Sequence, residues 1–209
     1  MGIPVEVPGL NTIVSEVADG TIVIVESGAD GAKSFLVRTL ARTALRKGTP
    51  VTYLTSRDGA SVTKAVANGQ SQVYSESQQL RVVELDSLAD WQPVGLEKGL
   101  LAIDSFSFLT LDLAPPQLAA VMRGLRERCA RDGMSVVLAT DRGMFEPRGE
   151  AIAVHLADGL MQFHTREGPE GLVRYLRIPK WPQGTLTDRN IYYDFDGAHM
   201  AIDLRRRVL

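Results

Sequence analysis

The sequence predicts an α/β fold in which a doubly wound, mainly parallel β-sheet has helices on both faces and ends in antiparallel hairpin strands. Three observations lead to this prediction. Short apolar runs alternate with amphipathic segments of helical length over most of the chain. The runs are apolar without interruption, which is typical of strands buried on both sides. Beyond about Leu160, strand-like segments follow one another directly, with turn residues between them.

The boundaries of the elements follow from these patterns. The strands expected in the parallel part cover residues 21–25, 51–55, 81–85, 100–103 and 135–140. The expected helices cover residues 34–47, a segment that ends near Asn68 and Gly69, and 115 to about 132. Gly48 and Gly133 stand where the C-terminal caps of two of these helices are expected. The expected C-terminal strands cover residues 160–165, 172–178, 191–195 and 199–204.

Length and composition indicate an ordinary globular protein. The 209 residues fit a single domain spanning 1–209, and a net charge of −2 offers no overall field that would attract nucleic acid or a membrane. Cys129 is the only cysteine, so an internal disulfide is impossible. We find no basic leader and no apolar stretch near the ~20 residues that span a bilayer. We therefore expect a cytoplasmic protein without membrane insertion.

A phosphate-binding loop is predicted directly after the strand 21–25. Such a loop needs glycines where backbone N–H groups approach phosphate, a lysine that reaches the β- and γ-phosphates, and a hydroxyl that ligates Mg²⁺. Against the pattern G-x-x-x-x-G-K-[ST], Lys33 and Ser34 match, whereas Ser27 and Ala32 replace the two glycines. Asp30 adds a negative charge that is expected to weaken phosphate binding unless Mg²⁺ or Lys33 offsets it. The residues expected to bind the nucleotide here are Ser27, Gly28, Ala29, Asp30, Gly31, Ala32, Lys33, Ser34 and Phe35.

A second part of the same site is expected at the end of the strand 100–103. Asp104 follows this strand, where a carboxylate can hold Mg²⁺ beside Ser34. ATP or ADP with Mg²⁺ is therefore the expected ligand. The alternatives are a surface turn before a helix for the loop, and a turn-capping role for Asp104.

The order of these elements resembles the KaiC/RadA branch of the RecA-like P-loop ATPases over nearly the whole chain, which implies a RecA-like fold. Residues 7–10 resemble the "PGL" of that family, 156–160 resemble its "ADG", and 177–184 are similar to its "K-x-R-G", with Pro182 in place of the arginine. In KaiC-like proteins this lysine reaches the nucleotide of a neighbouring subunit. The resemblance thus implies that Lys180 contacts nucleotide in a homo-oligomer, and an ordinary exposed lysine is the alternative.

Two further positions take their expected roles from the resemblance. The family carries a pair of glutamates after its second strand, one of which acts on the attacking water, and the matching residues here are Arg57 and Asp58. Arg57 cannot act as a base, and Asp58, the expected catalytic residue, is one methylene shorter than glutamate. Weak or absent hydrolysis follows. The segment Thr140-Asp141-Arg142 occupies the place of the family's polar residue that senses the γ-phosphate, and Thr140 is the residue expected to contact the nucleotide.

These features predict an ATP-binding protein with weak or no hydrolysis that acts as a nucleotide-responsive regulatory or assembly component, alone as a homo-oligomer or with a protein partner. The alternatives are an active motor ATPase, a structural pseudo-ATPase that binds no nucleotide, and a DNA-associated recombinase paralogue. The near-neutral charge disfavours DNA. The cluster of arginines on the helix from 115 is either a DNA-binding surface or a solvated helix face, and it comprises Arg123, Arg126, Arg128 and Arg131.

Overall fold

The central element of the structure is a mixed β-sheet. The computed structural model of the chain describes residues 2–28, 30–67, 79–91, 98–168, 171–182 and 187–203. Within these residues nine strands form one sheet in the order β11-β10-β9-β8-β3-β7-β6-β4-β5. The strands are β3 (Ile22–Ser27), β4 (Val51–Thr55), β5 (Leu80–Glu84), β6 (Leu100–Asp104), β7 (Ser135–Asp141), β8 (Gly159–Gly168), β9 (Gly171–Lys180), β10 (Thr187–Phe195) and β11 (Met200–Ile202).

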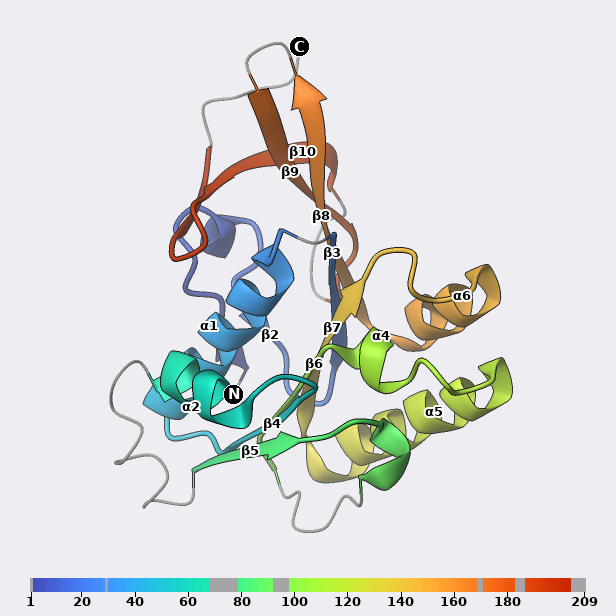
Figure 1. Cartoon of the computed structure of the whole chain (residues 1–209). Helices are drawn as coiled ribbons and strands as arrows, with labels where there is room; N and C mark the ends of the chain where they lie inside the picture. The colour runs from blue at the N-terminus through green and yellow to red at the C-terminus, as the bar shows by residue number, and fades with distance from the viewer. Residues whose placement is uncertain are drawn as a thin grey trace.

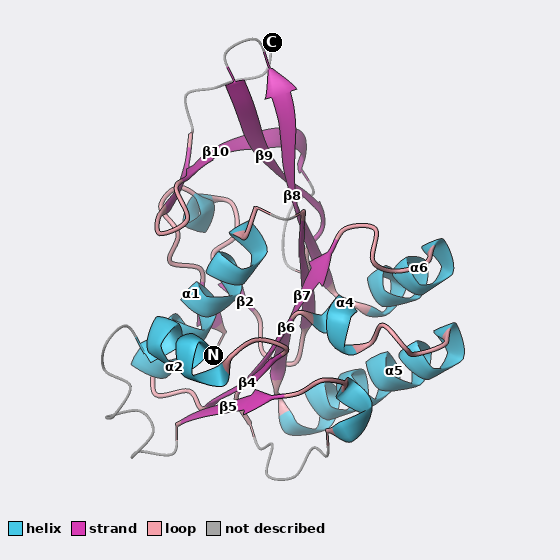
Figure 2. Cartoon of the chain, in the orientation of Figure 1, coloured by secondary structure: helices cyan, strands magenta, loops and turns pink. Residues whose placement is uncertain are grey.

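The strand directions agree with the prediction. Strands β5, β4, β6, β7, β3 and β8 are parallel to their neighbours, whereas β9, β10 and β11 are added by antiparallel pairing. The antiparallel strands extend past the helical layers (Figure 2). Parallel strands end at the same edge of a sheet, and in register Ser27 lies beside Asp141 and Thr55 beside Asp104. This edge therefore gathers the polar strand ends.

Helices cover both faces of the sheet, as expected. One face carries α1 (Ala32–Arg46) and α2 (Gly59–Ala67), and the other carries α4 (Phe106–Leu109), α5 (Pro115–Asp132) and α6 (Pro147–Leu156) (Figure 1). The residues of β3 alternate between the two faces. Val23 and Val25 pack in the core beneath α1, and Ile22 and Ile24 pack in the core beneath α5 and α6. Burial on both faces explains why residues 22–25 of β3 are all apolar.

Helix boundaries are set by local chemistry. Pro115 begins α5, where its missing N–H costs nothing, and Gly133 follows the helix with φ +65°, a left-handed conformation that glycine adopts without strain. The predicted limits of this helix are confirmed. Helix α6 was missed because its buried residues are the small Gly149 and Ala153, which give no clear apolar period.

The N-terminal segment adds a short ribbon to the α1 face. It contains the paired strands β1 (Ile3–Pro4) and β2 (Glu16–Val17), with the 3₁₀ helix η1 (Leu10–Thr12) between them. A second 3₁₀ helix, η2 (Leu88–Asp90), follows β5. The expected end of the second helix at Asn68 and Gly69, and of the last strand at Leu204, lie outside the described residues. None of the helices found in the described ranges is long and apolar enough to cross a membrane.

Candidate functional site

The predicted phosphate loop connects β3 to the first turn of α1. Gly31 stands immediately before α1 with φ +78° and ψ 0°, a left-handed conformation that reverses the chain into the helix. The Gly31 carbonyl accepts a hydrogen bond from the Phe35 N–H at 3.0 Å. The first N–H groups of a helix have no intrahelical acceptor, so this end of α1 favours an anion. Ala29 lies outside the described residues.

Lys33 forms an ion pair that the sequence analysis did not foresee. Its ammonium Nζ lies 2.6 Å from Oδ1 of Asp141 at the end of β7, and the lysine side chain is only 3% exposed. The other carboxylate oxygen of Asp141 accepts hydrogen bonds from Ser105 at 2.5 Å and Ser107 at 3.2 Å. Burial raises the pKa of Asp141, but Lys33 and the two hydroxyls outweigh it and lower the pKa below its ordinary value. Asp141 is therefore an ionised carboxylate held against the loop lysine.

Ser34 and Asp104 lie together, as expected for a Mg²⁺ site. The Ser34 hydroxyl donates to Oδ1 of Asp104 at 3.0 Å, and the Tyr53 hydroxyl donates to Oδ2 at 2.9 Å. All three side chains are buried. Hydroxyl and carboxylate oxygens are the hard ligands that Mg²⁺ prefers, and this ion commonly takes one or two protein oxygens and completes its shell with phosphates and water. The residues present thus fit Mg²⁺ beside a polyphosphate.

Tyr53 orients the carboxylate of Asp104, which leads to a testable expectation. Burial, followed by the proximity of Asp104, raises the pKa of Tyr53 well above 10.0, so the hydroxyl stays protonated and donates. Substitution Tyr53→Phe leaves Oδ2 of Asp104 without this donor in a buried position. We expect a loss of about 1–3 kcal/mol in the free energy of unfolding, measured by urea denaturation. Tyr192→Phe, at a half-exposed ring on β10, is the control and is expected to change stability by less than about 0.5 kcal/mol.

Asp30 connects the loop to the C-terminal strands. Its carboxylate accepts hydrogen bonds from Thr165 of β8 and from the Tyr193 hydroxyl of β10, each at 3.2 Å, and from the N–H of Ala32 at 3.2 Å. Burial and the neighbouring Asp30 raise the pKa of Tyr193, which keeps its hydroxyl a donor. Phe35 also faces these strands, because its ring packs against Phe195 with centroids 5.4 Å apart. The loop conformation therefore depends on strands distant in sequence.

The position predicted for a catalytic base is occupied by a helix cap. Asp58 accepts the N–H groups of Ala60 at 3.3 Å and Ser61 at 2.8 Å at the start of α2. Hydrogen bonds from Ser61 lower the pKa of Asp58, so the carboxylate is a weaker base than an ordinary aspartate. Arg57 is exposed, and its backbone N–H donates to the Thr55 hydroxyl at 3.0 Å. A structural role accounts for Asp58, and its catalytic role remains a prediction.

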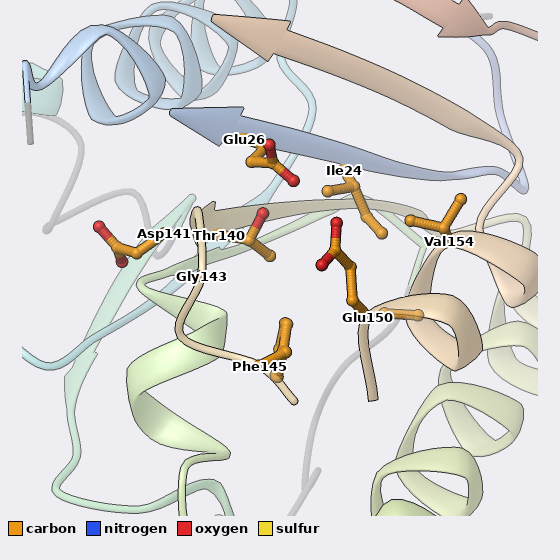
Figure 3. Close-up of a pocket in the computed structure, with 9 residues that line it drawn as sticks. Ile24, Glu26, Thr140, Asp141, Gly143, Phe145, Glu150 and Val154 are labelled. Carbon is orange, nitrogen blue, oxygen red and sulfur yellow. The ribbon is translucent and has the colours of Figure 1, made fainter. Parts of the chain in front are cut away.

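Thr140 points to the side of the sheet away from α1. It lines a small pocket with Glu26 and Glu150. Asp141 also borders this pocket, but its carboxylate points away from these side chains (Figure 3). The pocket has a volume of about 10 Å³, enough for about one water molecule, and is far too small for a nucleotide. The Thr140 hydroxyl is buried and makes no hydrogen bond to the described residues. The next residue, Asp141, is the one at this strand end whose side chain pairs with Lys33.

Lys180 lies at the C-terminal end of α6. Its ammonium donates to the carbonyl oxygens of Val154 at 3.2 Å and His155 at 3.4 Å, and also to that of Ala157. A cation here satisfies helix carbonyls that have no intrahelical partner. The contact with a neighbouring subunit's nucleotide remains a prediction.

Several residues that contact the site were not among those expected to bind the nucleotide. Asp141 had a usable signal, because a polar residue at the end of a buried strand next to the loop strand faces the same edge. Tyr53 carried no such signal, since a tyrosine within a strand ordinarily packs in the core. Tyr193 lies 163 residues from Asp30, and no local pattern connects them.

Comparison with known proteins identifies the fold. No protein-family model and no curated protein matches the chain. Among solved structures, the KaiC-like protein PH0186 from Pyrococcus horikoshii superposes with a TM-score of 0.76 at 17% identity, covering 97% of this chain and 99% of that one. The flagellar accessory protein FlaH from Methanocaldococcus jannaschii superposes with a TM-score of 0.75 at 15% identity, covering 97% and 98%. The predicted RecA-like fold of the KaiC type is therefore confirmed.

Proposed function

We propose that this chain binds ATP or ADP together with Mg²⁺ at the loop between β3 and α1. The observation that carries the proposal is the hydrogen bond from the Ser34 hydroxyl to Asp104 at 3.0 Å. Ser34 directly follows the buried Lys33, so the candidate ion ligands and the phosphate-binding lysine lie together. Lys33 and the loop N–H groups would hold the phosphates, and Ser34 and Asp104 would hold the ion. Mg²⁺ supplies neutralisation of the phosphate charge when it is bound.

The same site supports binding better than turnover. A general base needs a pKa near the working pH and must reach the attacking water. Asp58 has a lowered pKa and already caps α2, and the guanidinium of the preceding Arg57 offers hydrogen-bond donors but no acceptor for a proton. We infer that hydrolysis is slow or absent and that binding itself is the signal, because a ligand that prefers one state shifts a conformational equilibrium without turnover.

We propose that nucleotide binding changes the association of this chain with other protein chains. The fold is shared with a flagellar accessory protein, which fits a component that acts through association with other proteins. Lys180 is the residue expected at a subunit boundary from the resemblance to KaiC-like proteins, and association with further copies of this chain is the form of assembly that this expectation favours. Association with a different protein is the alternative form of this assembly.

A second candidate is a structural scaffold that binds no nucleotide. The observation in its favour is the ion pair of Lys33 with Asp141 at 2.6 Å, which neutralises the lysine that phosphate would use. Asp30 adds a further carboxylate within the loop. Phosphate must compete with these charges, and the outcome depends on whether Mg²⁺ offsets them.

Thermal unfolding with and without Mg²⁺-ATP distinguishes the two candidates. If the ligand is present at about 100 times its Kd, binding adds about 2.7 kcal/mol to the free energy of unfolding. For a chain of 209 residues this corresponds to a rise in Tm of roughly 5–10 °C. Lys33→Ala is expected to abolish the rise, whereas Lys47→Ala, an exposed lysine just after the same helix, is expected to retain it.

For each variant, the Tm with nucleotide is compared with the Tm without nucleotide. This difference does not include the effect of the substitution on the stability of the free protein. The scaffold is supported instead if neither ATP nor ADP raises the Tm of the wild type at millimolar concentration. The loop assignment fails if Lys33→Ala gains as much as the wild type.

A further inference from the structure

The helical face opposite α1 carries a groove that the nucleotide site does not use. It lies between α5 and α6 and has a volume of about 840 Å³. Both helices begin after strands of the same parallel sheet and run alongside each other (Figure 1). The residues that line it include Pro115, Ala119, Arg123, Arg148, Ile152 and His155.

The groove is positively charged, and its charges are available. Among the arginines of α5, Arg126 pairs with Asp158 at 3.0 Å, and Arg128 and Arg131 both pair with Asp132. Arg123 lies on the groove and is exposed, and it has no ion pair with any residue in the described ranges. The DNA-binding surface considered from the sequence is therefore largely a set of intramolecular pairs.

Arg148 of α6 provides the second free cation. It is exposed, lies on the groove and is likewise unpaired within the part of the chain that the structure describes. His155, seven residues further along α6, adds a ring N–H that can donate a hydrogen bond to a carboxylate. No acidic residue lines the groove among the described residues. A ligand with carboxylates matches this pattern by charge.

The surface between the charges is apolar. Ala119 of α5 and Ile152 of α6 lie there, with Pro115 at one end. Beneath them the helices approach closely, since a Cβ atom on Gly149 would lie 3.4 Å from Cδ2 of Leu118. An apolar strip flanked by charges fits the apolar face of a helix, as in other helix-in-groove complexes.

The dimensions fit two helical turns. Arg148 and His155 are seven residues apart on α6, which corresponds to roughly 10 Å along the helix axis. A helix that lies in the groove would present acidic residues at about the same spacing, with apolar residues between them. A simple anion would leave the strip between Ala119 and Ile152 unused, and so would a nucleic-acid backbone.

We propose that the groove between α5 and α6 binds an acidic amphipathic helix of a protein partner, with Arg123 and Arg148 pairing its carboxylates. This site is separate from the phosphate loop, which leads into α1 on the other face of the sheet. It gives the assembly role a defined surface.

Fluorescence anisotropy at low salt tests the proposal with a labelled synthetic helix of about 18 residues that carries glutamates seven apart and leucines between them. We expect binding that weakens about tenfold or more in Arg123→Glu/Arg148→Glu and with rising salt. The control Arg131→Glu/Arg166→Glu carries the same charge change at exposed arginines outside the groove and is expected to bind like the wild type. A peptide of identical composition with its glutamates spread around the helix should bind about tenfold more weakly than the first.

Three results would overturn this proposal: no binding of the helix by the wild type, equal loss in both double variants, or displacement of the helix by millimolar tripolyphosphate or an oligothymidylate. Lys33→Ala is measured in parallel and should bind the helix normally. Failure of nucleotide binding is thus distinguished from failure of the groove.

Discussion

Asp141→Asn is expected to destabilise the nucleotide-free protein by about 3 kcal/mol. Lys33 is 3% exposed, and its ammonium lies 2.6 Å from the carboxylate that the substitution neutralises. Removing one charge of a buried pair leaves the other without compensation, which costs about 3–5 kcal/mol, and the partial exposure of Asp141 at 28% favours the lower end. Urea denaturation without nucleotide measures the effect.

The same substitution is expected to act in the opposite direction on nucleotide binding. Asp141 holds the lysine that the phosphates need and places a negative charge beside them. An asparagine keeps the shape and removes the charge, so affinity for Mg²⁺-ATP should rise about tenfold, which is about 1.4 kcal/mol. The variant thus combines a lower Tm in the absence of ATP with a larger rise on adding it. Asp112→Asn, at an exposed loop residue, serves as the control.

The pH dependence follows from the lowered pKa of Asp141. A group with a pKa below its unfolded value of 3.8 contributes stability above that pH and loses the contribution as the pH falls through the folded pKa. The wild type should therefore lose part of its stability on acidification below about pH 4, and Asp141→Asn should lack that part. Parallel acid unfolding curves for the two proteins would show that the ion pair contributes nothing.

Most of the helices and strands could be predicted from the sequence, because the pattern of apolar residues within each segment indicates its type. The uninterrupted apolar residues of β3 and β7 record burial on both faces, and the proline and glycine around α5 mark its ends. Helix α6 carries weaker information, since it is buried through Gly149 and Ala153. A helix that packs through small residues leaves no apolar stripe to detect.

The parts of the site formed by residues adjacent in sequence could be predicted. The contacts between residues far apart in sequence could not. Lys33 and Ser34 are fixed by the loop and the helix that follows, and Asp104 by its strand. The choice between Thr140 and Asp141 depends on one step along β7, which turns a side chain to the other face of the sheet. Such a step lies within the uncertainty of any strand end read from sequence alone.

The contact between the C-terminal strands and the loop leads to the second large expected effect. Phe163 of β8 is fully buried and packs edge-on against Tyr193, with ring centroids 5.2 Å apart. Tyr193 in turn donates to Asp30 of the loop. Replacing Phe163 by alanine removes a large core side chain and is expected to cost about 3–5 kcal/mol in the free energy of unfolding.

The substitution should also loosen the loop. Without the Phe163 ring, Tyr193 loses one side of its packing and holds Asp30 less firmly, so the loop becomes more mobile although no loop residue has changed. Hydrogen exchange of the amides of Gly31 and Ala32 should rise in Phe163→Ala beyond the increase in β4, which reports overall stability.

Two matched variants separate packing from the hydrogen bond. Phe163→Leu keeps most of the volume and is expected to cost less than about 1.5 kcal/mol with little change at the loop. Tyr193→Phe removes the donor to Asp30 and should raise exchange at Gly31 and Ala32 with a stability loss of only about 1 kcal/mol. If Phe163→Ala destabilises the protein but leaves loop exchange in step with β4, the C-terminal strands stabilise the sheet without controlling the loop.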